Sequence, residues 1–319
     1  MTSSDGALKT MLTRRGFALG AGMFGLSGVL PAVAGDEEEK PLLRFGLVAD
    51  VHSGSLPSTP PPGEVRAFRE SPRKLREFVD AMNARRVDFI VELGDFAECH
   101  PTQEATVAAL DEIEREFVRF EGPRYHVLGN HDLQGLPREV FLEHAPNTGT
   151  AKGKPYYAFM AKGFTFVVLD HGYYADGTAM VPGRTAWTKG HLSPAERTWL
   201  DKTIAAAPGK VIVFSHWRLD PETGVEPGLH ARDAAETRAL FERGAVKSTW
   251  HEKEPKVIAS FSGHHHDGCF NLLNGIGYYG LRAMCMGSGA EQSGYAEVAI
   301  CASGRVMVTG FRKARSVCW

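Results

Sequence analysis

The sequence predicts an α/β fold, a sandwich in which helices pack outside two facing β-sheets. In the first half of the chain, short apolar segments alternate with amphipathic segments of helical period, which is typical of parallel strands joined by helices. In the second half, two apolar segments meet at a Lys-Gly turn and several short strands follow, which indicates antiparallel pairing. With 319 residues and 43% hydrophobic composition, the chain can bury the core that such a fold needs.

The first half is expected to begin with a buried strand at Leu42–Asp50, followed by an exposed Pro-rich loop at Ser55–Val65. A helix should start at Ser71, because the apolar residues after it recur at the spacing of one helical face: Leu75, Phe78, Val79 and Met82. A strand at 87–95, a helix at 104–120 and a strand at 124–130 complete this half.

The second half is expected to open with an antiparallel pair of strands at 156–160 and 164–170. A helix at 193–206, a strand at 210–216, a helix at 230–243 and a strand at 256–264 follow. Short strands separated by Gly-rich turns then continue to Arg312. The pattern therefore predicts a second, mostly antiparallel sheet that faces the first.

Charge and cysteine content exclude several classes of protein. The formal net charge is −2 and no block rich in Lys and Arg occurs, so general nucleic-acid binding is not expected. The five cysteines show no Cys-x-x-Cys spacing, which argues against a zinc ribbon and against a disulfide framework. Whether any two of them pair is left open.

The N-terminal segment has the pattern of an export signal. Arg14–Arg15 directly precede an apolar, Gly/Ala-rich run that is too short for an ordinary membrane span, and Ala32–Ala34 offers a small-residue cleavage site. We interpret residues 1–34 as a removable twin-arginine signal and 35–319 as a single domain. This predicts contact with the twin-arginine machinery, delivery to the bacterial periplasm or the extracellular space, and no membrane span in the mature chain. A retained anchor is the alternative.

Polar residues follow the expected strands at the points where the strands end. Ligands of open α/β sheets collect at the carboxyl ends of the strands, so these side chains should meet at one place. They are Asp50 and His52 after the first strand, Asp95 after the second, Asn130 and His131 after the third, His216 after the strand at 210–216, and His264 and His266 after the strand at 256–264.

Three consecutive histidines follow the last of these strands. In extended backbone alternate side chains share a face, so His264 and His266 can bind together while His265 points away. The triplet is internal, which argues against an affinity tag. A solvated polar loop remains the alternative when the triplet is considered by itself.

The whole series reads Asp-x-His, Gly-Asp, Gly-Asn-His-Asp, a single His, and Gly-His-x-His. It resembles the signature of the calcineurin-like metallophosphoesterase superfamily and covers about Phe45 to Asp267. The resemblance implies a four-layer α/β/β/α sandwich with two facing mixed sheets. It also implies a dinuclear metal-dependent hydrolase that cleaves phosphoester bonds of a small-molecule substrate, with a metal-bridging hydroxide as nucleophile.

Two metal ions are implied, whether manganese, iron, zinc or cobalt. Seven mixed oxygen and nitrogen ligands are too many for one first-row ion and suit two ions about 3.5 to 4 Å apart. By resemblance Asp95 is the bridging carboxylate. The other ligands are Asp50, His52 and His266 for one ion, and Asn130, His216 and His264 for the other.

The resemblance also implies roles beside the metal ligands. His131 would stabilise the phosphoryl group or protonate the leaving group, and Asp132 would fix its tautomer. Glu98 stands where the purple acid phosphatase branch has a tyrosine ligand, so we expect no purple chromophore and a supporting or structural role for Glu98. Substrate contacts are predicted at Asn130, His171, Trp217 and Arg218. For Trp217 and Arg218, packing within the loop is the alternative.

The motifs say little about the substrate. The preference for monoesters or diesters, the metal and the oligomeric state are left open. One alternative is a nucleotide pyrophosphatase-type diester hydrolase. Another is a metal-poor, protein-binding scaffold of the same fold, against which the presence of all seven candidate ligands argues.

Overall fold

Two six-stranded sheets form the centre of the structure. This computed structural model describes residues 39–59, 65–221, 228–243 and 255–319. The expected export signal at 1–34 and part of the Pro-rich loop lie outside the described residues. Glu39–Trp319 form one compact unit.

The first sheet joins the beginning of the chain to its end. β1 pairs in parallel with β2, and β2 pairs in parallel with β3, while on its other side β1 pairs antiparallel with β10. In spatial order the strands are β12 (Val317–Cys318), β11 (Val306–Arg312), β10 (Gly294–Ile300), β1 (Leu43–Val48), β2 (Phe89–Glu92) and β3 (Arg124–His126).

The second sheet is mixed, with three parallel pairings at its centre and an antiparallel pairing at each edge. In spatial order its strands are β4 (Tyr157–Ala161), β5 (Phe164–Val168), β6 (Val211–Ser215), β7 (Val257–Ser262), β9 (Ile276–Gly280) and β8 (Cys269–Leu273). The expectation of a mostly antiparallel second sheet is therefore wrong. The C-terminal antiparallel strands complete the first sheet instead, and the implied arrangement of two mixed sheets is confirmed.

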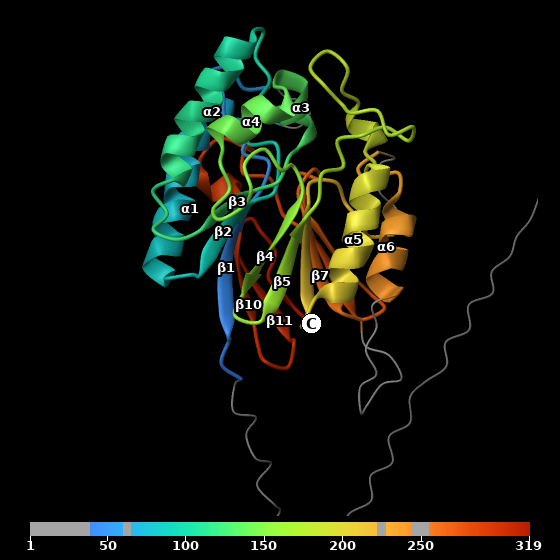
Figure 1. Cartoon of the computed structure of the whole chain (residues 1–319). Helices are drawn as coiled ribbons and strands as arrows, with labels where there is room; N and C mark the ends of the chain where they lie inside the picture. Colours follow the sequence, from blue (N-terminus) through green and yellow to red (C-terminus); the bar gives the residue numbers. More distant parts are fainter. Residues whose placement is uncertain (1–38, 60–64, 222–227, 244–254) are drawn as a thin grey trace, which may run out of the picture. The chain divides into compact units, whose positions relative to one another are not determined.

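Helices cover the outer faces of both sheets, which gives the four layers α/β/β/α (Figure 1). On the side of the first sheet lie α1 (Ser71–Arg85), α2 (Gln103–Phe117), α3 (Asn130–Gly135) and α4 (Arg138–His144), and on the side of the second lie α5 (Pro194–Ala206) and α6 (Ala234–Arg243). α1 buries the four apolar residues predicted for its inner face, Leu75, Phe78, Val79 and Met82. α5 begins where Ser193 accepts a hydrogen bond from the backbone of Glu196.

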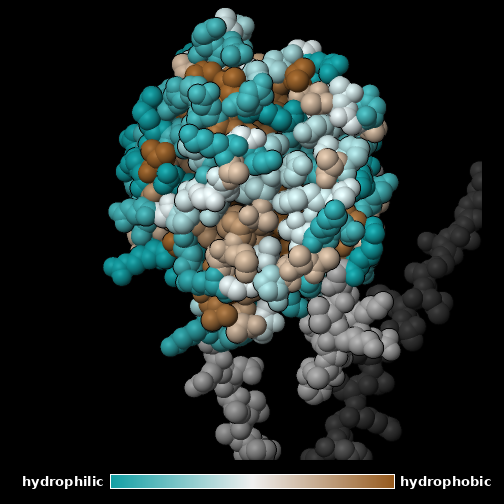
Figure 2. Space-filling view, in the orientation of Figure 1, coloured by the Kyte–Doolittle hydropathy of each residue, from teal (hydrophilic) through white to brown (hydrophobic). Residues whose placement is uncertain are grey.

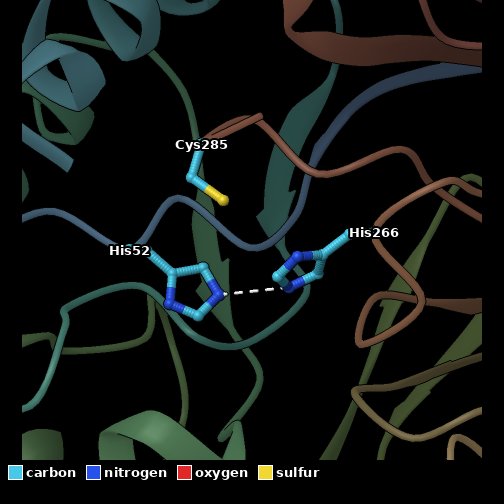
Figure 3. Close-up of side chains that lie close together, drawn as sticks. All are labelled: His52, His266 and Cys285. Carbon is cyan, nitrogen blue, oxygen red and sulfur yellow. Dashed lines mark hydrogen bonds between the residues drawn. The ribbon is translucent and has the colours of Figure 1, made fainter. Parts of the chain in front are cut away.

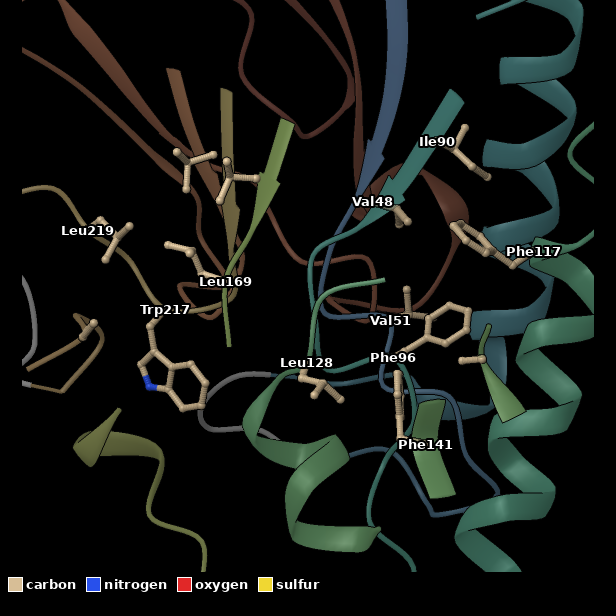
Figure 4. Close-up of a cluster of buried hydrophobic side chains, with 14 of the residues drawn as sticks. Val48, Val51, Ile90, Phe96, Phe117, Leu128, Phe141, Leu169, Trp217 and Leu219 are labelled. Carbon is tan, nitrogen blue, oxygen red and sulfur yellow. The ribbon is translucent and has the colours of Figure 1, made fainter. Parts of the chain in front are cut away.

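Strand alternation divides the apolar side chains between two cores. On β1 and β2, Phe45 and Phe89 point between the sheets, where their rings stack 4.9 Å apart. Ile90, the neighbour of Phe89, points to the helices and belongs to the other core. Figure 4 shows part of that core, where Phe96 and Leu128 lie on the loops that follow β2 and β3. This packing holds the loops at the carboxyl ends of the strands.

None of the helices in the described residues is long and apolar enough to cross a bilayer. Hydrophilic residues cover most of the face shown in Figure 2, and hydrophobic ones form small, separate patches there.

Candidate dinuclear metal site

Seven predicted ligands meet at the carboxyl ends of five strands from both sheets. Each is at most 9% exposed. They are Asp50 and His52 after β1, Asp95 after β2, Asn130 at the start of α3, His216 after β6, and His264 and His266 after β7.

The backbone at the site is strained. Four of the seven have positive φ, a region that non-glycine residues rarely adopt and that often marks functional sites: Asp50 (51°), His52 (45°), Asp95 (59°) and His264 (65°). Glycine is required at two motif positions because a side chain there would collide with a neighbouring carboxylate. A Cβ at Gly129 would lie 2.2 Å from the Asp95 carboxylate, and one at Gly263 would lie 2.7 Å from that of Asp50.

Asp95 lies between two groups of possible metal ligands. Its Oδ2 is 3.2 Å from Nε2 of His216 and 3.6 Å from Nε2 of His52. Asp50, His52 and Asp95 form one group, and Asp95, His216 and His264 form another, each with ligand atoms within 4.8 Å of one another. The backbone N–H of His131 donates to Oδ1 of Asp95 at 2.7 Å, which leaves Oδ2 to face both groups.

The remaining two predicted ligands complete these groups. Nε2 of His266 lies 3.3 Å from Nε2 of His52 and 3.5 Å from Oδ1 of Asp50. Oδ1 of Asn130 lies 3.2 Å from Nε2 of His216. The structure thus brings all seven together around Asp95.

Hydrogen bonds outside the site orient the imidazoles. Nδ1 of His52 bonds Oε2 of Glu98 at 2.7 Å, and Nδ1 of His216 donates to the carbonyl of Leu93 at 2.9 Å. Both rings therefore turn Nε2 inward. Nε2 of His264 is buried and has no hydrogen-bond partner among the described residues. A buried nitrogen without a partner is costly, and a cation would give it one.

The charge states of most ligands suit divalent cations. Burial, together with His216, lowers the pKa of His264 to about 3, and burial with His131 lowers that of His52. Burial alone would raise the pKa of Asp95, but His216 and His131 lower it well below its ordinary value. Neutral imidazoles and ionised carboxylates are the forms that bind metals. The donors therefore fit a pair of cations that share Asp95.

Glu98 links a predicted ligand to the predicted catalytic histidine. Its Oε2 bonds His52, and its Oε1 lies 2.7 Å from Nδ1 of His131. Although burial opposes this, the two histidines lower the pKa of Glu98 to about 2, so the carboxylate is ionised. Burial alone would lower the pKa of His131, yet Asp95 and Glu98 raise it. His131 thus keeps a proton on Nδ1 and presents Nε2 away from Glu98.

The expected contact between Asp132 and His131 is wrong, because Glu98 takes this place. Instead, the Asp132 carboxylate accepts hydrogen bonds from the backbone N–H groups of Asp95 and Phe96 at 2.9 and 3.0 Å. It also accepts one from Gly129 at 2.9 Å. Asp132 therefore ties the loop after β2 to the loop after β3.

Three of the four residues predicted to contact substrate, Arg218, Trp217 and His171, are buried. Arg218 is 1% exposed, and its guanidinium bonds Asp220 at 2.9 Å and Nδ1 of His265 at 3.2 Å. His265 therefore contacts Arg218 rather than the ligand groups. Trp217 and His171 are fully buried. This burial favours packing over substrate contact for Arg218, Trp217 and His171, whose predicted substrate contacts stay predictions.

Sequence reasoning missed two neighbours of the site. Cys285 follows β9 and lies beside His52 and His266. Trp187 is 43% exposed, and its ring centroid lies 5.9 Å from that of His264. Cys285 follows a strand of the same sheet as His264, so the rule for strand ends could have found it. No local pattern marks Trp187.

Comparisons with known proteins agree with this geometry. The family model described as calcineurin-like phosphoesterase matches residues 43–268. The chain is 26% identical over 287 residues to the "Manganese-dependent ADP-ribose/CDP-alcohol diphosphatase" of Arabidopsis thaliana, covering 78% of this chain and 88% of that one. It is 27% identical over 267 residues to the protein of the same name from Oryza sativa subsp. japonica, covering 72% and 79%.

A solved structure shares the fold. The crystal structure of a dimetal phosphatase from Danio rerio matches with a TM-score of 0.74 and 20% identity, covering 88% of this chain and 99% of that one. Since the family model spans most of the chain, the protein belongs to the calcineurin-like phosphoesterase family.

Proposed function

We propose that this metal-dependent phosphoester hydrolase cleaves the diphosphate bond of a nucleoside diphosphate conjugate. The observation that carries the catalytic part is the position of Asp95 Oδ2, within 3.6 Å of imidazole nitrogens from both ligand groups. When bound, two cations there would polarise the phosphoryl oxygens and lower the pKa of the hydrolytic water.

The ligands divide between the two sides of Asp95. Asp50, His52 and His266 would hold one cation, and Asn130, His216 and His264 would hold the other. Asp95 and Asp50 contribute negative charge, which offsets the repulsion between two cations close together. Despite burial, Asp95 and Asp50 raise the pKa of His216 to about 10, so a cation bound to its Nε2 would take the place of a proton.

His131 is the general acid of this proposal. Its side chain is 22% exposed, whereas the ligands around it are almost completely buried. Its hydrogen bond to Glu98 fixes the ring, and Asp95 and Glu98 raise its pKa, which favours the protonated form. It can therefore donate a proton from Nε2 to the departing phosphate oxygen.

Two observations support a nucleotide substrate. Both plant relatives described above are named for the hydrolysis of ADP-ribose and CDP-alcohols. The exposed ring of Trp187 beside His264 offers a flat surface on which a nucleobase can stack. A simple phosphatase would need no such surface.

A substrate panel tests the proposal. The protein, loaded with Mn²⁺, would be assayed with ADP-ribose, a CDP-alcohol, p-nitrophenyl phosphate and its bis ester. We expect the highest kcat/KM for the nucleotide conjugates, with a nucleoside monophosphate as product. We also expect Trp187→Ala to raise KM for the conjugates and to leave the nitrophenyl esters unaffected. Faster turnover of the simple monoester would reject the diphosphatase proposal.

We also propose that the protein is exported by the twin-arginine route. Arg14–Arg15 and the apolar run after them support this. In a bacterial host, the protein should appear in the periplasmic fraction, shortened at its N-terminus. Replacing both arginines by lysine should keep it in the cytoplasm, and periplasmic delivery of that variant would reject the route.

A further inference from the structure

A sulfur atom lies beside two of the predicted ligands. Cys285 is fully buried, and its thiol is within 4.8 Å of ring nitrogens of both His52 and His266. Figure 3 shows the thiol directed toward the space between the two imidazoles. Cys285 is not one of the seven residues that the sequence motifs predict as ligands.

Backbone hydrogen bonds hold Cys285 against the first ligand group. Its N–H donates to the carbonyl of Asp50 at 3.0 Å, and the N–H of Met284 donates to that of Ala49 at 2.9 Å. The loop is therefore paired with the chain segment that carries Asp50 and His52. These bonds hold the backbone of Cys285 beside that of Asp50.

A buried lysine fixes the same loop from the other side. Nζ of Lys74, on α1, donates to the carbonyls of Met284, Met286 and Gly287 at 3.1, 3.2 and 2.8 Å. Lys74 is 1% exposed.

We propose that Cys285 is a ligand of the cation held by Asp50, His52 and His266, bound through its sulfur as a thiolate. The inference rests on the proposed two-cation site. The thiol proton is released to solvent when the sulfur–metal bond forms. Thiolates favour soft ions, so this position should bind Co²⁺ or Zn²⁺ better, relative to Mn²⁺, than a site of nitrogen and oxygen ligands alone. The two cation positions would then differ in metal preference.

Cobalt spectroscopy tests the sulfur ligand without using activity. The full-length, metal-free protein would be titrated with Co²⁺ while its visible and near-ultraviolet absorption is recorded. We expect a sulfur-to-cobalt charge-transfer band in the near ultraviolet that saturates at one equivalent, with visible cobalt bands that continue to two. Cys285→Ser and Cys285→Ala should lose the near-ultraviolet band and keep visible cobalt bands, which also report that they fold.

A second buried cysteine provides the control. Cys301 lies at the end of β10, and its thiol bonds the carbonyl of Glu39. Cys301→Ala should keep the charge-transfer band. Cys285→Ser should bind Co²⁺ at least about 10-fold more weakly than the parent protein, because loss of even a group that supports a ligand costs at least this much metal affinity. The loss of affinity for Mn²⁺ should be smaller.

The possible failures are distinguishable. Two equivalents of bound cobalt without a charge-transfer band would overturn the sulfur ligand and leave the proposed function standing. A band that persists in Cys285→Ser would show that another thiol produces it and would also overturn the inference. Absence of cobalt binding, with no binding of Mn²⁺ either, would overturn the proposed function as well.

Discussion

Oε1 of Glu98 lies 2.7 Å from Nδ1 of His131, and the other oxygen of the same carboxylate lies 2.7 Å from Nδ1 of His52. One buried side chain therefore orients both a predicted metal ligand and the proposed general acid. Its negative charge favours the protonated form of His131. Glu98 stands where the purple branch of the superfamily has a tyrosine ligand, and here its side chain supports two histidines.

Glu98→Gln should reduce turnover and change its pH dependence. Loss of a group that supports a ligand typically costs about 10 to 100-fold, and we expect kcat to fall by that amount. A general acid is active when protonated, so activity falls as pH rises through its pKa. Without the carboxylate, the pKa of His131 falls, and the alkaline limb of the kcat profile should move to lower pH. The exposed Glu104→Gln is the control, and an unmoved limb at full metal loading would contradict the role.

Asp95→Asn should weaken both cations at once. The substitution keeps the shape of the side chain but removes the charge that faces both ligand groups, so metal affinity should fall by more than about 100-fold and turnover should be lost. Metal analysis after dialysis measures this. His265→Ala is the matched change, because His265 contacts Arg218 instead, and it should keep two equivalents. Equal metal loss in the two variants would mean that the triplet is misassigned.

His131→Ala should keep both metals and lose catalysis selectively. We expect a fall of about 10² to 10⁴-fold in kcat for a nucleotide conjugate, whose leaving group needs a proton. The fall should be much smaller for bis(p-nitrophenyl) phosphate, because nitrophenolate leaves without protonation. Equal losses for the two substrates would remove His131 from the role of general acid.

His171 should make stability depend on pH. Burial lowers its pKa from the ordinary 6.5 to about 4, against the opposing effect of Asp233. Between these values the unfolded chain binds a proton that the folded chain does not, so the free energy of unfolding falls by about 3 kcal/mol as pH drops from 6.5 to 4. Below pH 4 this contribution causes no further loss.

Urea unfolding of the metal-free protein between pH 4 and 7 checks this effect. His171→Gln should make the fall in stability over this range shallower by up to about 1.4 kcal/mol per pH unit, the effect of one proton. An unchanged slope in His171→Gln would show that His171 titrates normally in the fold.

The residues predicted as ligands come together in the structure because each follows a buried strand. The periodicity of the hydrophobic residues locates each strand. The polar residue that follows the strand then lies at the carboxyl end of the sheet, as Asp50 does after β1 and His216 after β6. The order of strands in space is not encoded locally. β10 lies next to β1 although Val48 and Gly294 are far apart in the sequence, so the pairing of the C-terminal strands was predicted wrongly.

The contacts around the ligands were less predictable. Asp132 is next to His131 in sequence, yet its side chain turns to the backbone of Asp95 because α3 begins at Asn130 and directs the two side chains apart. Glu98 reaches His131 only through the fold of the loop after β2. Arg218 lies two residues after His216, and no local pattern marks its burial.

Anomalous diffraction from crystals of the Mn²⁺-loaded protein tests the central claim most directly. The account predicts two manganese peaks about 3.5 to 4 Å apart, one on each side of the Asp95 carboxylate. The first should lie against Asp50, His52 and His266, and the second against Asn130, His216 and His264. A single peak, or peaks that do not contact Asp95, would contradict it.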